Sequence, residues 1–363
     1  MSAPVKERQS QPRAELGYFS GIGTIFKLEV LQRVRSRGWY MILALWFTVI
    51  ALVVGLSVLN MGAEGQGTGQ LMFELVIAFV LFFGLLIAPA LSSNSITGDR
   101  ANGTLAILQN TLITPGQLIL GKWLAAWVAS LGFLVVTVPL LLWAMTYGDT
   151  YLPALPVLLG MLVLELAVVC GIGVGVSALA NRTLFAVLIS YLLVAMLGLG
   201  TLIAYGLSMK FVEVEIKAST QEWSEEMMNG EADWDENDYT CGTTLYDQTA
   251  YATDRNTWIL ATNPFVVVAD AAPRPVLKPG QDEDIIGPMG GISDLVRSSQ
   301  AGIANTIPCR NGIKDLDATV EKSPPLWPLG LGLQGLLTAG LLVAGRTKLR
   351  TPAGRLASGT RIA

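Results

Sequence analysis

The sequence predicts an all-α polytopic membrane protein with six transmembrane helices. Of its 363 residues, 52% are hydrophobic and only 14% are charged, and the mean hydropathy of +0.51 is too high for an ordinary soluble protein. Crossing about 30 Å of hydrocarbon takes roughly 20 helical residues. Six apolar segments are long enough, and we place them at 39–60, 71–92, 123–147, 153–180, 183–207 and 325–345.

The N-terminal segment, residues 1–38, is predicted to lie in the cytoplasm. It begins with polar residues and has no apolar core, so we expect no cleavable signal peptide. Residues 24–37 mix apolar and basic residues in the pattern of an amphipathic helix at the membrane interface. Basic residues favour the cytoplasmic side, and the tail, residues 346–363, is basic as well. We therefore expect a multi-pass protein of the cell membrane with both termini in the cytoplasm.

Residues 208–324, between the last two predicted spans, are expected to form an extracytoplasmic domain. This segment is strongly acidic from Glu222 to Asp238. It also contains Cys241 and Cys309, and an oxidising compartment favours a disulfide between them, with two free thiols as the alternative. The apolar stretch 258–272 is too short to span, so we expect an interfacial or re-entrant element there.

The polar-to-amphipathic loop 93–122 interrupts the first five spans, which together cover residues 39–207. Charged residues crowd a turn between two glycines, and leucines then recur three and four apart, so that they share one helical face. A short helix with one apolar face is suited to the groove of another protein. The alternative is a helix that rests on the bilayer surface. The candidate contact residues are Asp99, Arg100, Gly103, Thr104, Leu105, Leu108 and Leu112.

Two acids fall within predicted spans and are candidates for a translocation pathway. Glu165 lies near the middle of its span, where a carboxyl group is costly and is by default a functional candidate. The alternative is a protonated or hydrogen-bonded structural acid that faces a Ser, Thr or Tyr of a neighbouring helix. Glu74 lies close to the start of its span, from which its side chain can also reach the lipid headgroups.

The residue inventory predicts no catalytic residues, no metal site and no cofactor bound by this chain. The sequence contains no histidine, which removes Ser-His-Asp and Cys-His arrangements, and its three cysteines form no Cys-x-x-Cys motif. Residues 116–123 match most of a phosphate-binding loop, but Trp123 stands where a hydroxyl must hold Mg²⁺. No cytoplasmic segment is long enough to fold as an ATP-binding domain. Any ATP hydrolysis must come from a separate subunit.

The loop residues resemble a known family. The run Gly98-Asp-Arg-Ala-Asn-Gly-Thr-Leu105, followed by Thr114-Pro115 and Gly121-Lys122, is similar to the first cytoplasmic loop of ABC-2-type ABC transporter permeases, most closely actinobacterial members. The resemblance covers most of the chain, including the amphipathic N-terminal helix, the six spans and Asn263-Pro264-Phe265 in the outer segment. Ala101 departs from the pattern, because a second acid is usual there.

The resemblance implies a type V exporter-like fold and the permease subunit of an ATP-driven exporter. The loop would be the coupling helix that docks on a separate ABC ATPase, present in two copies, which uses ATP and Mg²⁺. A second permease, identical or homologous, would complete the pathway. Two alternatives remain: a proton-coupled secondary carrier with Glu165 as relay, and a membrane receptor or sensor with an acidic ligand domain. Carriers usually show internal repeats and broken helices, which we do not see here. The substrate does not follow from the sequence.

Overall fold

The computed structural model describes residues 17–61, 68–105, 113–147, 151–223, 239–273, 287–303, 307, 309–314 and 324–350. Within these residues, six helices are long and apolar enough to cross a membrane, which confirms the six predicted spans. The spans cover Arg37–Leu59, Gly69–Ala101, Pro115–Tyr147, Ala154–Leu179, Thr183–Phe211 and Trp327–Leu349.

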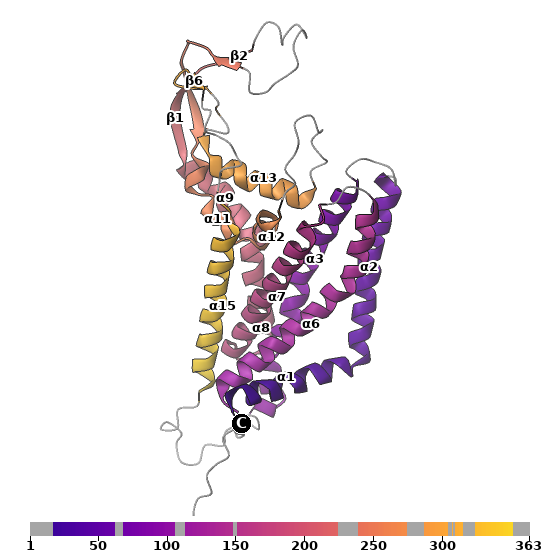
Figure 1. Ribbon diagram of the computed structural model, residues 1–363. Helices are drawn as coiled ribbons and strands as arrows, with labels where there is room; N and C mark the ends of the chain where they lie inside the picture. The colour runs from indigo at the N-terminus through magenta and orange to yellow at the C-terminus, as the bar shows by residue number, and fades with distance from the viewer. Residues whose placement is uncertain are drawn as a thin grey trace, which may run out of the picture.

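The spans are built from a small set of helices around one core (Figure 1). Helix α7 is central and contacts α3, α6, α8 and α15. The N-terminal helix α1 lies across the end of the bundle where the C-terminal helix also finishes. The helices of the bundle are α1 (Tyr18–Val34), α2 (Arg37–Met61), α3 (Thr68–Ser92), α4 (Thr97–Ala101), α6 (Pro115–Ala144), α7 (Ala154–Leu179), α8 (Thr183–Ala195), α9 (Thr201–Ser208) and α15 (Trp327–Leu349).

Glycines on α7 allow its neighbours to approach closely. A Cβ atom at Gly173 would lie 1.9 Å from Ser92 Oγ of α3, and one at Gly175 would lie 2.7 Å from Leu341 Cβ of α15. Neither contact leaves room for a side chain. Small residues at helix contacts are typical of membrane proteins, where close packing replaces the hydrophobic effect between helices.

The third span begins earlier than the sequence predicted. We expected it to start at residue 123, but α6 begins at Pro115. Thr114 and Gln117 form a capping box, and proline occupies the first helical position, where its missing N–H is not needed. The Thr114-Pro115-Gly116 signal therefore starts a helix instead of breaking a loop. The last part of loop 93–122, including Lys122, belongs to α6.

Span five contains a π-helical turn, η2 (Met196–Gly200), between α8 and α9. Asn263 contacts this turn from a distant part of the chain: its Nδ2 donates to Gly198 O at 2.8 Å and to Thr201 Oγ1 at 2.9 Å. The Asn263 side chain also caps α12 (Pro264–Ala271) by accepting from Phe265 N. One side chain thus joins the outer segment to span five.

The stretch 258–272 folds into two short helices, α11 (Trp258–Ala261) and α12, separated at Asn263-Pro264. Helix α12 packs against α7, α15 and α13 (Pro288–Ala301), and Val267 and Val268 are fully buried. Helix α13 lies across the bundle at the end opposite α1 (Figure 1). The apolar side chains of this stretch are therefore buried where α12 packs against the end of the bundle.

The outer segment is not all helical. Its strands form a four-stranded sheet in the order β4-β1-β5-β6 and a two-stranded sheet of β2 and β3. The Cys241–Cys309 disulfide joins the two sheets, as predicted, and Cys170 is a buried free thiol. The all-α prediction thus describes the bundle but misses these strands: β1 (Glu213–Ala218), β2 (Gln221–Trp223), β3 (Tyr239–Cys241), β4 (Tyr246–Tyr251), β5 (Cys309–Arg310) and β6 (Ile313–Lys314).

Candidate functional site

The loop between α3 and α6 presents an exposed turn that follows α4. Residues 101–104 are all exposed. Gly103 has φ of +73°, a left-handed conformation that glycine adopts without steric cost. Thr104 Oγ1 donates to Asp99 O at 3.2 Å, which closes the turn on itself. Among the described residues of the loop, this turn is the longest exposed run and is open to contact with another protein.

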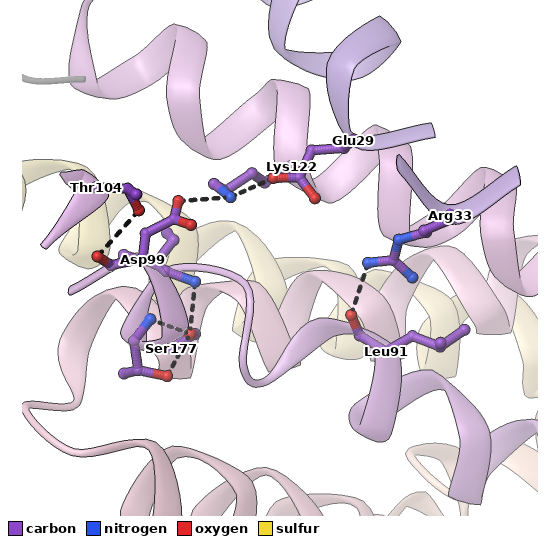
Figure 2. Close-up of polar contacts among 9 residues, drawn as sticks. Glu29, Arg33, Leu91, Asp99, Thr104, Lys122 and Ser177 are labelled. Atoms are coloured by element: carbon purple, nitrogen blue, oxygen red, sulfur yellow. Dashed lines mark hydrogen bonds and ion pairs between the residues drawn. The ribbon is translucent and has the colours of Figure 1, made fainter. Parts of the chain in front are cut away.

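Lys122 links this loop to the N-terminal helix (Figure 2). Its Nζ contacts Glu29 Oε1 of α1 and lies 2.8 Å from Asp99 Oδ2 of α4. The Lys122 side chain is 3% exposed, whereas the two carboxylates keep 17% and 24% exposure. A lysine this buried requires opposite charges beside it, because an unpaired buried charge is strongly unfavourable. The ion pairs therefore hold α1, α4 and α6 together.

Helix α4 is also attached to α7. Ser177 Oγ accepts from the backbone N–H groups of Ile96 and Thr97, each at 3.1 Å, at the start of α4. At the other end, the Arg100 guanidinium donates to the carbonyl of Ala180, just after α7. The first N–H groups of a helix have no partner within it, and here a neighbouring helix supplies one.

The N-terminal helix packs closely on α6. A Cβ at Gly121 would lie 2.7 Å from Ile25 Cβ, and Gln117 Nε2 donates to Tyr18 O at 3.1 Å. Arg33 Nη2 donates to Leu91 O at 2.9 Å, at the end of α3 (Figure 2). Burial lowers the pKa of the Arg33 guanidinium, and the nearby Glu29 carboxylate opposes that change. Arginine nevertheless stays charged at physiological pH.

The predicted contact residues have different environments. Gly103 and Thr104 are exposed, Asp99 pairs with Lys122 within the chain, and Arg100 is half-buried. Leu105 is 6% exposed and packs in the main core, so it does not share an outward apolar face as we expected. Leu108 and Leu112 lie outside the described residues. Of the predicted contact residues that the structure describes, the exposed ones are thus Gly103 and Thr104 in the polar turn.

The two acids within the spans occupy unlike sites. Glu74 is 8% exposed and accepts from Gln70 Nε2 and from Gly290 N, both at 2.8 Å. It therefore caps the start of α13. Glu165 is fully buried in α7 beside Gln334 of α15, whose Nε2 donates to Thr262 O at 3.0 Å. Among the described residues, no Lys or Arg pairs with Glu165.

Sequence reasoning missed the side chains that connect elements. In the sequence, Lys122 belongs to an incomplete phosphate-loop pattern and to the Gly121-Lys122 pair of the family motif, and neither pattern predicts its place in a helix between two carboxylates. The one sequence feature that could have indicated this ion pair is Glu29, a single acid in an otherwise basic helix. No sequence pattern indicated the role of Asp270 of α12. Its Oδ2 accepts from Leu326 N at 2.6 Å and from Trp327 N at 3.0 Å, and its Oδ1 lies 3.6 Å from Arg297 Nε.

The described residues contain no group of three or more His, Cys, Asp or Glu side chains that could hold a metal ion. The polar side chains of the site bind one another and backbone groups across α1, α3, α4, α6 and α7. Such an arrangement can transmit a displacement between elements.

The fold and the loop contacts together indicate a class of protein. It is a multi-pass membrane protein in which α1 lies across one end of the bundle and the short helix α4, between spans two and three, is held by buried polar contacts. Residues 23–229, from α1 into the outer segment, match the sequence model of the family described as ABC-2 family transporter protein. The chain belongs to this family, and it is a membrane-spanning permease subunit. It matches no curated protein sequence.

Proposed function

We propose that the chain is the permease subunit of an ATP-driven exporter. It forms the translocation pathway with a second permease, identical or homologous, and is driven by two copies of an ABC ATPase that bind ATP and Mg²⁺. The loop 93–122 docks on the ATPase from the cytoplasm, where both termini also lie. Residues 208–324 are extracytoplasmic.

The observation that carries this proposal is the placement of Lys122. Its two ion pairs connect the loop to α1 and to span three, while Ser177 and Arg100 connect α4 to span four. A force on the exposed turn would therefore reach three other helices through buried polar contacts. A loop that only joins two spans has no need of such anchoring.

The mechanism we propose is alternating access. Closure of the two ATPases around ATP displaces the docked turns, and α4 moves together with α1, α6 and α7. Packed helices switch between discrete arrangements and do not deform continuously, so the pathway between the two permeases opens outward as a unit. Glu165, enclosed between α7 and α15, is the ionisable group that such a movement would bring towards the pathway.

The experiment compares two substitutions at Asn102, which is exposed in the turn. Tagged permease is captured from its native membrane, and a co-purifying ATPase is identified by its phosphate-loop peptide. We expect Asn102→Trp to reduce capture by about tenfold or more, because a large side chain separates closely fitted surfaces. Asn102→Ala is the matched control and should capture like the parent.

Two outcomes would contradict the proposal. Capture of the parent without any ATPase would favour the carrier or receptor alternatives. Equal capture by Asn102→Trp and the parent would show that the turn is not the docking element. The amount of permease in the membrane is measured alongside. It should be the same for both variants, because both substitutions lie outside the apolar core of the spans.

A further inference from the structure

One face of helix α1 packs against none of the residues that the structure describes. Its inward face carries Ile22, Ile25 and Glu29, which pack on α6 or bind Lys122. The outward face is apolar in part, and four of its side chains are strongly exposed: Phe19 (85%), Leu28 (49%), Leu31 (41%) and Val34 (44%). Lys27, Leu31 and Val34 are spaced four and three apart and so share this face.

The exposed charges on and beside this helix are all basic. Lys27, Arg35 and Arg37 are exposed, and none of them forms an ion pair with a described residue. Of the described residues at this end of the bundle, the two acids are Glu29 and Asp99, and both contact Lys122. The outward face of α1 and the residues just after this helix therefore combine apolar side chains with basic side chains that no described acid pairs.

We infer that the outward face of α1 binds anionic phospholipid headgroups, with its apolar side chains inserted at the acyl boundary. Helix α1 lies across the end of a six-span bundle (Figure 1), where the headgroup layer meets the protein. Interfacial helices combine apolar insertion with attraction of Lys and Arg to anionic lipid. Arginine and lysine form charge-assisted hydrogen bonds with phosphate oxygens.

This lipid preference is independent of the proposed transport function. It concerns which lipid occupies one surface, and it would hold whether or not an ATPase binds the loop. A basic residue near an anionic membrane contributes roughly 1 kcal/mol, which corresponds to about a fivefold preference. Three such residues in one short stretch of chain, Lys27 on α1 and Arg35 and Arg37 just after it, should give a readily measured enrichment.

The test uses a bimane fluorophore on Leu31→Cys, in nanodiscs that contain equal amounts of phosphatidylcholine and phosphatidylglycerol. One lipid at a time carries bromine, which quenches the fluorophore on contact. We expect brominated phosphatidylglycerol to quench several-fold more than brominated phosphatidylcholine. High salt should reduce the difference, because exposed charges are screened.

Three controls make the test decisive. The triple variant Lys27→Gln, Arg35→Gln, Arg37→Gln should quench equally with both lipids, whereas Lys27→Arg, Arg35→Lys, Arg37→Lys should keep the preference. A label at Leu142, which is 50% exposed near the other end of α6, should show no preference. Equal quenching in the parent, a preference that survives charge removal, or a Leu31 label shielded from both lipids by another protein would each overturn the inference.

Discussion

At the scale of single residues, Lys122 shows how a membrane protein can use a buried charge to fix geometry. One ammonium lies between two carboxylates, so the three side chains together carry a net negative charge. The lysine attracts both carboxylates, whereas Glu29 and Asp99 repel each other, so the cluster is held together only while the lysine is present. Removing the cation should therefore be more harmful than removing either acid.

We expect Lys122→Met to lower the free energy of unfolding by about 3 kcal/mol, near the lower end of the range for breaking a buried pair, because both carboxylates keep some solvent contact. Thermal unfolding of the detergent-purified protein measures this. The triple variant that adds Glu29→Gln and Asp99→Asn should recover most of the loss, since no unpaired charge remains. Equal melting temperatures for the parent and Lys122→Met would show that the ion pairs do not stabilise the fold.

At the scale of elements, acidic side chains cap helices that belong to other parts of the chain. Glu74 of α3 binds the start of α13, and Asp270 of α12 binds the start of α15. Helix N-termini favour negative charge because their N–H groups are unpaired and the backbone dipoles align. These contacts fasten the outer helices to the spans.

Glu74→Ala should release the first turns of α13 without unfolding the bundle. Loss of an N-cap costs about 1 kcal/mol, and the lost charge at the helix N-terminus adds to it. Hydrogen exchange of residues 288–294 should become several-fold faster, while exchange in α7 stays unchanged. Glu74→Gln keeps an acceptor oxygen and should have a smaller effect. Unaltered exchange in Glu74→Ala would mean that other contacts hold α13.

At the scale of the whole molecule, orientation in the membrane is a prediction that two exposed positions can test. Leu295 lies on α13 and is 56% exposed, and Asn102 is exposed in the turn at the opposite end. The parent protein should be unreactive, because Cys170 is buried and the other two cysteines are bonded.

In intact cells, Leu295→Cys should react with a membrane-impermeant maleimide and Asn102→Cys should not. The reason is the positive-inside rule, which places the basic end of the bundle in the cytoplasm. When the permease is expressed without its ATPase, Asn102→Cys should react once the membrane is permeabilised, which shows that the site is accessible. The reverse pattern in intact cells would invert the topology.

The sequence predicted the features that depend on composition and on local pattern. The six spans follow from length and hydropathy, and the Cys241–Cys309 bond follows from two cysteines in one outer segment. Hydropathy alone does not locate the start of α6, because the helix begins at the Thr114–Gln117 capping box, before the continuous apolar stretch. The strands were missed because they are short and because several of them pair across long intervals, as β1 does with β5.

The candidate site was predicted only in outline. The loop 93–122 was found from its polarity between two apolar segments, but which residues face outward depends on neighbours that the local pattern does not reveal. Leu105 faces the core, and Asp99 faces Lys122. Contacts such as Glu29 to Lys122 join residues on different helices, so no periodicity within either helix could indicate them.

The π-helical turn in span five has a consequence for the order in which the protein can be completed. Its Gly198 carbonyl accepts from Asn263, which leaves the ribosome only after the whole of span five and the first half of the outer segment. A carbonyl without a partner is costly in the bilayer. Span five therefore enters the membrane before its final hydrogen bond can form. The Thr201 hydroxyl of the same span also donates to the Gly198 carbonyl, at 2.8 Å, so span five satisfies this group by itself until Asn263 adds its hydrogen bond.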